Sequence, residues 1–423
     1  MTAGPRVARR VGARDALRAS LAYHFAPTDV AGVLGRHASV QYDPLAPLGC
    51  NHDLVFAARV PGYRIGDWRG PVYEGRVGYD GWDKQASLIE IDGQPARRVY
   101  HRWHGERWHD EVLLRWPDET AEVVGQLRDR GPLDAAAIEL DTRVEAWRGS
   151  WYGPRLAKRI VRALWHTGRV GTRRREHGRH VYDLIERVLP GSVLARPTPS
   201  EEEAVRTLVG DRHRSTGLLR ATAPAEVWSL HAPASARHRA IAELVSEGEL
   251  SRVEVDGAAH HAAPGWLEAL DGSRSAPGVR FVAPLDPLLW DRPGLRATFG
   301  FDYLWEVYKP ASQRRWGYYV LPVVRDDRFV ARIDAVRDAS GSRGSVWRLR
   351  RWWWEAGAEA AVERAPGGRA GFLGELAEAA SRFAHYLGVS RAAVRAGVPK
   401  DVADAVRRGA GEPWSVGREE PGS

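Results

Sequence analysis

The sequence predicts an α+β fold with tandem winged-helix domains, then a small antiparallel β-barrel-like domain and a C-terminal helix. Three observations indicate it. A helical run, a glycine and a two-strand pattern recur in the first 270 residues. β-rich runs joined by turn residues dominate from 279 to 355, and helical apolar spacing returns from 371 to 389.

The first segment begins with a basic start that leads into a helix near 13–23. The start lacks an apolar core, so it is not a secretory signal. A short apolar approach, Ala38-Ser39-Val40, then predicts a strand that ends near Asp43.

The second segment repeats the plan in "RLAKRIVRALWHTGRVGTRRREHGRHVYDL". Apolar residues follow helical spacing from 156 to 164, and Gly168 can cap that helix. Strands are expected at 169–172 and 179–184, with a turn at 176–178 between them.

The third segment has a helix marked by apolar residues at 240–245, then Gly248 and the alternating strand "ELSRVEV". Helix, glycine turn and hairpin together are typical of a winged helix, which docks on DNA. The basic hairpin residues Arg173, Arg174 and Arg175 suit phosphate contact. The alternative for each unit is a plain helix and hairpin with solvated charges.

The C-terminal part predicts strands at 279–282, 305–308, 317–324 and 329–333, with a turn at Asp326-Asp327 and a further strand in "SVWRLRRWWWE". The three adjacent tryptophans favour core packing over base stacking. A hairpin tip with Arg314 and Arg315 can enter a DNA groove or remain a solvated loop.

These features predict five segments: 1–140 with the Gln-x-Asp motif, 141–196 and 197–272 as winged helices, 273–355 as the barrel-like domain, and 356–423 as the C-terminal helix with a disordered tail.

Charge and composition narrow the class of function. Lys and Arg total 62 against 54 Asp and Glu, a net charge of +8 that favours double-stranded DNA as partner. The single cysteine excludes an internal disulfide and a cysteine-based metal site. Because the histidines are scattered, no metal and no cofactor are expected. No run of eighteen apolar residues occurs, so we expect no transmembrane helix. We also expect no membrane partner, a cytoplasmic, nucleoid-associated location and a monomer.

The motif Gln41-Tyr42-Asp43 carries the candidate chemistry. In a strand, residues two apart point to the same side, so Gln41 and Asp43 would face one space and Tyr42 the other. Such a pair can hold a water molecule or a cation, although the spacing is also common by chance.

Several longer blocks resemble a known family. They are "VQYDPLAPLGCNHDLVFAARVPGY", "VYDLIERVLP", "APLDPLLWDRPGLRATFGFDYLWEVYKPASQRRWGYYVLPV" and "RFVARID". They are similar to the YcaQ/AlkX family, bacterial winged-helix DNA glycosylases related to AlkZ that unhook interstrand crosslinks. The resemblance spans roughly residues 10 to 400. It implies a monofunctional glycosylase for N7-alkylated purines, including bulky and crosslinked bases.

The resemblance also implies site residues. The family signature Gln–apolar–Asp falls on Gln41 and Asp43, with Tyr42 in place of the usual aliphatic residue. Lys84 stands where relatives commonly have histidine, and Asp53 replaces a family histidine, so the substrate range is open. The predicted substrate- or DNA-binding residues are His52, Arg59, Lys84, Ser87, Arg173, Arg174, Arg175, Arg314 and Arg315.

The chemistry of an N7-alkylated purine explains why a carboxylate and an amide suffice. The cationic base leaves without being protonated, so a carboxylate at Asp43 need only stabilise the developing positive charge on the sugar and accept a proton from water. Gln41 can orient that water without adding charge. The alternatives are a non-catalytic winged-helix DNA-binding regulator, which does not need this pair, and a protein-interaction scaffold.

Overall fold

The protein is described here from a computed structural model that covers residues 8–140, 155–272, 276–338 and 345–411. The predicted disordered tail and part of the predicted second-domain boundary lie outside these residues. Contacts divide the chain into two units. Unit 1 comprises 1–68, 212–227 and 242–423, and unit 2 comprises 69–211 and 228–241. The five-segment division is finer than these units and stays a prediction.

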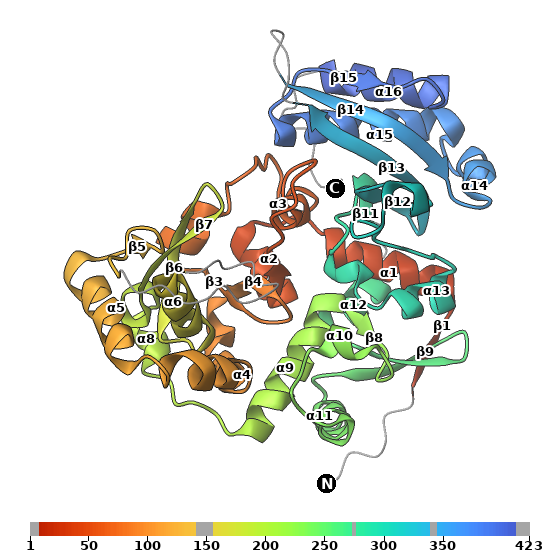
Figure 1. Cartoon of the computed structure of the whole chain (residues 1–423). Coiled ribbons are helices and arrows are strands. Elements are labelled where there is room, and N and C mark those ends of the chain that lie inside the picture. The colour runs from red at the N-terminus through yellow and green to blue at the C-terminus, as the bar shows by residue number, and fades with distance from the viewer. Residues whose placement is uncertain (1–7, 141–154, 273–275, 339–344, 412–423) are drawn as a thin grey trace. The chain divides into compact units, whose positions relative to one another are not determined.

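Unit 1 combines described segments from the N-terminal and the C-terminal parts of the chain (Figure 1). Its elements are β1 (Arg9–Val11), α1 (Ala13–Phe25), α2 (Val30–His37), β2 (Ser39–Gln41), α3 (Asn51–Ala57), β8 (Leu218–Leu219), β9 (Ser251–Val255), β10 (Ala258–Ala262), α12 (Pro264–Asp271), β11 (Ala276–Phe281), α13 (Arg292–Phe299), β12 (Val320–Asp326), β13 (Arg328–Asp338), β14 (Val346–Trp354), α14 (Ala358–Arg364), α15 (Gly368–Leu387), β15 (Ala392–Val394) and α16 (Lys400–Gly411).

Unit 2 has fewer strands. Its elements are β3 (Gly78–Trp82), β4 (Ala86–Glu90), α4 (Gln94–Trp108), α5 (Pro117–Arg130), β5 (Leu133–Asp134), α6 (Leu156–His166), β6 (Val170–Glu176), β7 (Arg179–Leu184), α7 (Ile185–Val188) and α8 (Gly191–Leu194). Three helices cross the division between the units: α9 (Glu201–Thr216), α10 (Ala225–Trp228) and α11 (Ala234–Glu247).

The helix–glycine–hairpin pattern is present where the sequence predicts it. Gly168, which follows the C-cap residue of α6, has φ of 73°, and β6 pairs antiparallel with β7 from Val170↔Leu184 to Glu176↔Arg179. Gly248 has φ of 82° after α11, ahead of the antiparallel pair β9 and β10. Glycine suits these positions because a side chain would be strained at positive φ. That these units are winged helices remains an interpretation.

The C-terminal sheet has the order β11-β12-β13-β14-β15, with α15 packed against it (Figure 1). Phe383 of α15 contacts Phe281 of β11 and Trp347 of β14, at ring-centroid distances of 5.1 and 5.0 Å. The sheet curls into a half barrel but stays open. One predicted feature is wrong, because β15 pairs parallel with β14 and the sheet is therefore mixed.

The predicted strand at 305–308 is also wrong, because residues 301–310 contain no strand. The turn predicted at Asp326-Asp327 is present, since β12 ends at Asp326 and β13 begins at Arg328. The core of this region joins α1 to the sheet. It contains Leu17, Leu21, Phe25, Val282, Leu288, Leu289, Leu295, Phe301, Tyr303, Val324 and Phe329.

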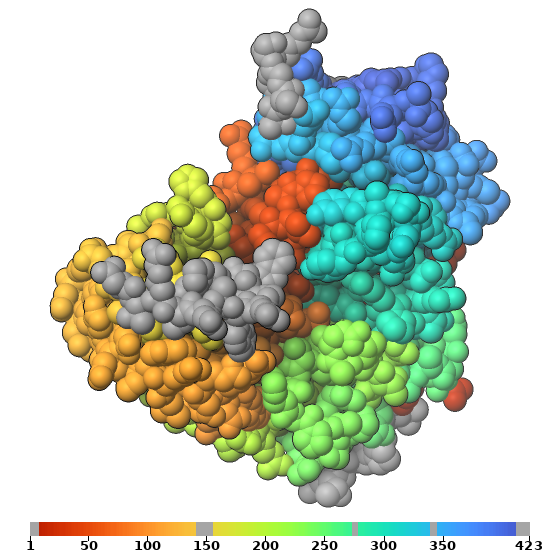
Figure 2. All heavy atoms as spheres, in the orientation of Figure 1, coloured from red at the N-terminus to blue at the C-terminus, as the bar shows by residue number. Residues whose placement is uncertain are grey.

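Segments that are far apart in the sequence therefore pack together in unit 1. Figure 2 shows the red N-terminal segment side by side with the cyan segment near residue 300 and the blue C-terminal segment. Within the described residues, no helix is long and apolar enough to cross a membrane.

Candidate active site around Gln41 and Asp43

The end of β2 is fixed by a buried asparagine. Asn51, which is fully buried at the start of α3, donates from Nδ2 to the carbonyl of Gln41 at 2.9 Å. Its Oδ1 accepts a hydrogen bond from the backbone N–H of Leu285 at 3.0 Å. One side chain thus holds the candidate motif to a segment more than two hundred residues away. The sequence carries no signal for this role, because both contacts depend on tertiary folding.

Asp43 lies just beyond β2 and is partly exposed. Its Oδ1 accepts the backbone N–H of Leu45 at 2.9 Å, which orients the carboxylate. Burial raises the pKa of Asp43 above its ordinary value, and the Leu45 hydrogen bond only partly opposes this. The carboxylate is therefore held in a site that strengthens its affinity for a proton, as a general base requires.

The amide oxygen of Gln41 is an acceptor without a donor in the described part of the chain. This atom, Oε1, is buried and has no hydrogen-bond partner among the described residues. A buried acceptor without a donor is costly, and such atoms are typical of sites that receive a water or a ligand. Gln41 and Asp43 thus offer an acceptor and a carboxylate two residues apart.

Tyr42 packs against His52. The two rings stack with centroids 4.1 Å apart and planes at 15°, while Trp68 meets His52 edge-on at 5.3 Å. His52 is only 2% exposed. This burial argues against the predicted direct contact of His52 with DNA, and the stacking indicates that His52 instead holds Tyr42 and the backbone of the motif in place.

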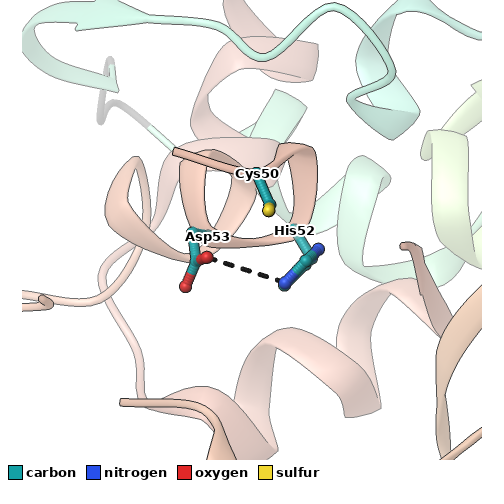
Figure 3. A group of neighbouring side chains, drawn as sticks. All are labelled: Cys50, His52 and Asp53. Atoms are coloured by element: carbon teal, nitrogen blue, oxygen red, sulfur yellow. Dashed lines mark ion pairs between the residues drawn. The ribbon is translucent and has the colours of Figure 1, made fainter. Parts of the chain in front are cut away.

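Asp53 faces His52 from the same turn of α3 (Figure 3). Its carboxylate lies 3.6 Å from His52 Nε2. The other oxygen, Oδ1, accepts hydrogen bonds from the hydroxyl of Tyr63 and the backbone N–H of Gly66, both at 2.8 Å. Asp53, the residue that departs from the family pattern, is thus anchored where it can orient the imidazole.

Cys50 completes a group whose possible ligand atoms lie within 4.8 Å of one another: Cys50, His52 and Asp53 (Figure 3). Two features argue for an orienting pair rather than a metal centre. Asp53 already accepts two hydrogen bonds. The group also lies at the N-terminal end of α3, where the helix dipole disfavours a cation.

Arg59 lies in the core beneath the motif. Its guanidinium donates to both carboxylate oxygens of Asp286, at 2.8 and 2.9 Å, and its Nε donates to His37 Nε2 at 3.2 Å. Both side chains of the Arg59–Asp286 pair are fully buried. This full burial argues against the predicted contact of Arg59 with substrate or DNA, and the side chain braces the site instead.

Two buried histidines complete this brace. Burial, followed by the nearby charge of Arg59, lowers the pKa of His24 to about 4, and the same causes lower the pKa of His37 well below its ordinary value. Neutral His37 can accept the hydrogen bond from Arg59. It immediately precedes Ala38, whose φ of 58° turns the chain into β2. Packing must hold this unfavourable backbone conformation, and the brace is part of that packing.

Lys84 and Ser87 belong to unit 2, on the hairpin of β3 and β4. Ser87 is 1% exposed and donates from Oγ to the carbonyl of Gln85 at 3.0 Å. The carbonyl of Lys84 accepts the hydroxyl of Ser229 at 3.2 Å. Burial of Ser87 argues against its predicted contact with DNA, whereas the partly exposed Lys84 remains a candidate.

The three hairpin arginines in unit 2 are engaged by protein groups. Arg175 pairs with the buried Asp80 through Nε at 2.5 Å and Nη2 at 3.0 Å. Arg173 donates to the carbonyl of Tyr73 at 3.2 Å. The exposed Arg174 pairs with Glu176 at 2.6 Å. Arg174 is therefore the best placed of the three to exchange a surface partner for a phosphate.

Arg314 and Arg315 lie on a loop rather than at a hairpin tip. The buried carboxylate of Glu306 shapes this loop by accepting the backbone N–H groups of Arg315 at 3.0 Å and Trp316 at 2.7 Å. Arg314 stacks over Tyr318, while Arg315 is exposed and stacks over Trp316. The loop presents cations next to aromatic rings.

Comparison with known proteins identifies the class. A family model described as DNA glycosylase AlkZ-like matches residues 34–411, so the chain belongs to the AlkZ-like DNA glycosylase family. This confirms the family relationship that the sequence blocks indicate. DNA is the partner that membership implies.

A solved structure has the same fold. DNA glycosylase AlkZ of Streptomyces sahachiroi aligns with a TM-score of 0.60 and 16% sequence identity, covering 91% of this chain and 99% of that chain. The α+β architecture predicted from the sequence is thereby confirmed at the level of fold.

Proposed function

We propose that the protein is a monofunctional DNA glycosylase that hydrolyses the N-glycosidic bond of N7-alkylated purines, including bulky adducts and interstrand crosslinks. One observation carries this proposal: a partly buried carboxylate, Asp43, lies two residues from Gln41, whose buried Oε1 lacks a protein donor among the described residues. A DNA-binding regulator has no use for such a pair.

The reaction follows from these two groups. Asp43 stabilises positive charge as the bond between C1′ and the base lengthens, and it accepts a proton from the attacking water. The electrons of the broken bond neutralise the cationic base, so no general acid is required. Gln41 orients the water through Oε1. No lysine contacts Asp43 among the described residues, which fits hydrolysis better than a Schiff-base lyase reaction.

The first experiment measures base release. DNA containing N7-methylguanine is incubated with the protein, and abasic sites are scored by alkali cleavage. We expect release above the spontaneous rate. Binding without release would favour a non-catalytic regulator, and no salt-dependent binding would favour a scaffold. A panel of methylated, bulky and crosslinked purines then defines the substrate range.

The second experiment replaces Asp43→Asn, which keeps the shape and removes the charge. Excision should fall by about 10²–10³-fold, the usual cost of one well-placed electrostatic group, with DNA affinity retained. Asp404→Asn on the exposed face of α16 is the matched control and should excise normally. Full activity in the Asp43 variant would refute the assignment.

A further inference from the structure

Tyr319 is a buried tyrosine that the reaction above does not use. It is 1% exposed, and its hydroxyl has no hydrogen-bond partner among the described residues. In two other buried tyrosines of unit 1, the hydroxyl is hydrogen-bonded. Tyr303 donates to the carbonyl of Val320 at 2.8 Å, and Tyr386 donates to that of Leu48 at 3.0 Å. A buried hydroxyl without a partner is destabilising, so its retention calls for a functional explanation.

The fold places Tyr319 close to the candidate site. Tyr319 directly precedes β12, which pairs with β13. The start of β12 pairs with the C-terminal part of β13, with Val320 opposite Asp334. Further along β13, the backbone N–H of Arg337 donates to the carbonyl of Pro47 at 2.6 Å. The turn that follows Asp43 is thus tied to the sheet that carries Tyr319.

Electrostatics agree with this placement. Burial, followed by the negative charge of Asp43, raises the pKa of Tyr319 well above its ordinary value. The phenol therefore stays protonated at neutral pH and can donate a hydrogen bond. The Asp43 carboxylate and Gln41 Oε1 are both acceptors, and the Tyr319 hydroxyl can add a donor beside them.

We propose that Tyr319 is a third catalytic residue, whose hydroxyl donates a hydrogen bond to the attacking water held by Asp43 and Gln41. This inference rests on the proposed function. A water molecule has two protons and two lone pairs. One O–H of the water donates a hydrogen bond to the Asp43 carboxylate and the other to Gln41 Oε1, while one lone pair accepts the Tyr319 O–H. The remaining lone pair is directed at C1′.

The assignment is chemically balanced. The water oxygen bonds to C1′ as the C1′–N bond breaks, and the bonding electrons leave with the base and cancel its positive charge. The proton released by the water passes to Asp43. Tyr319 keeps its own proton throughout, in keeping with a phenol that resists ionisation.

The test is Tyr319→Phe, which removes only the hydroxyl. We expect the single-turnover excision rate of N7-methylguanine to fall roughly 10- to 100-fold. The DNA dissociation constant should not change, and the Tm should stay the same or rise, because no protein hydrogen bond is lost. Tyr303→Phe is the matched control: its Tm should fall because the bond to Val320 is lost, while its excision rate is kept.

A double variant tests whether Tyr319 and Asp43 act on one water. Adding Tyr319→Phe to Asp43→Asn should cost much less than it does in the wild-type background, because the water is already misplaced. Wild-type excision by the Tyr319 variant would overturn this inference while leaving the proposed function standing. A Tm loss like that of Tyr303→Phe would also overturn it, by indicating a structural bond. Absence of excision by the wild-type protein would instead overturn the proposed function.

Discussion

Asp43, the proposed catalytic base, is not expected to stabilise the fold. Its folded-state pKa is raised by burial, so the folded protein binds the Asp43 proton more tightly than the unfolded chain does. The ionised carboxylate therefore works against folding at neutral pH. We predict that Asp43→Asn, although its excision should be about 10²–10³-fold slower, unfolds at the same Tm as wild type or a higher one in calorimetry at pH 7. A clear loss of Tm would assign Asp43 a structural role.

The same shift sets the pH dependence of excision. In the proposed mechanism Asp43 acts as an ionised carboxylate, so activity should be complete above its folded pKa and lost as the pH falls through it. Because that pKa is raised, the acid limb of the single-turnover rate should lie above the ordinary aspartate value of about 3.9. A rate that stays flat down to that value would exclude Asp43 as the base.

The Arg59–Asp286 pair, in contrast to Asp43, is expected to stabilise the fold. Both side chains are fully buried, and Asp286→Asn would leave the guanidinium charge without a counter-ion. We expect a loss of about 3–5 kcal/mol in the free energy of unfolding, measured by urea titration. Asp404→Asn, in an exposed pair on α16, should change it by about 0.5 kcal/mol or less. Similar losses in both variants would contradict the bracing role.

For single residues, the sequence alone could propose Gln41 and Asp43 but not the structural roles of the residues around them. Arg59 and His52 have the residue types of a DNA contact, yet both are only 2% exposed. Asn51 and Tyr319 carry no motif. Asn51 contacts Leu285, and Tyr319 lies near the charge of Asp43; both relations span more than two hundred residues, which local patterns do not record.

Among the elements, helices and hairpins followed the sequence closely because apolar periodicity and glycine turns act locally. The return strand predicted at 179–184 is β7, with the same limits. The failed strand at 305–308 has an apolar and aromatic pattern, but Glu306 interrupts it. Glu306 is 2% exposed, and its carboxylate accepts backbone N–H groups, which folds the segment into a loop.

That loop supports a prediction of its own. Although burial opposes it, hydrogen bonds from Trp316 and Arg315 lower the pKa of Glu306, so it is ionised at neutral pH. Glu306→Gln would weaken charge-assisted bonds, and we expect amide exchange at Arg315 and Trp316 to accelerate about 10-fold or more. Hydrogen-exchange mass spectrometry checks this, with peptides of α16 as the internal control. Unchanged exchange would show that other contacts order the loop.

For the whole molecule, the net charge of +8 predicts how binding depends on salt. Each phosphate neutralised by the protein releases counterions, so affinity for DNA should fall linearly on a double-logarithmic plot against salt. Arg315 is exposed beside Trp316 on the Glu306 loop and has no carboxylate within ion-pair distance among the described residues. It is the cation of this loop best placed to meet a phosphate.

We predict that Arg315→Gln lowers the slope of that plot by about 1, weakens binding to damaged and undamaged DNA alike, and leaves the single-turnover rate at saturating protein unchanged. Lys400→Gln at the exposed start of α16 is the control, since Lys400 already pairs with Asp404 at 2.8 Å. Fluorescence anisotropy across a salt series measures both slopes. Equal slopes for wild type and Arg315→Gln would remove the loop from the DNA-binding surface. A loss confined to damaged DNA would instead make Arg315 a lesion contact.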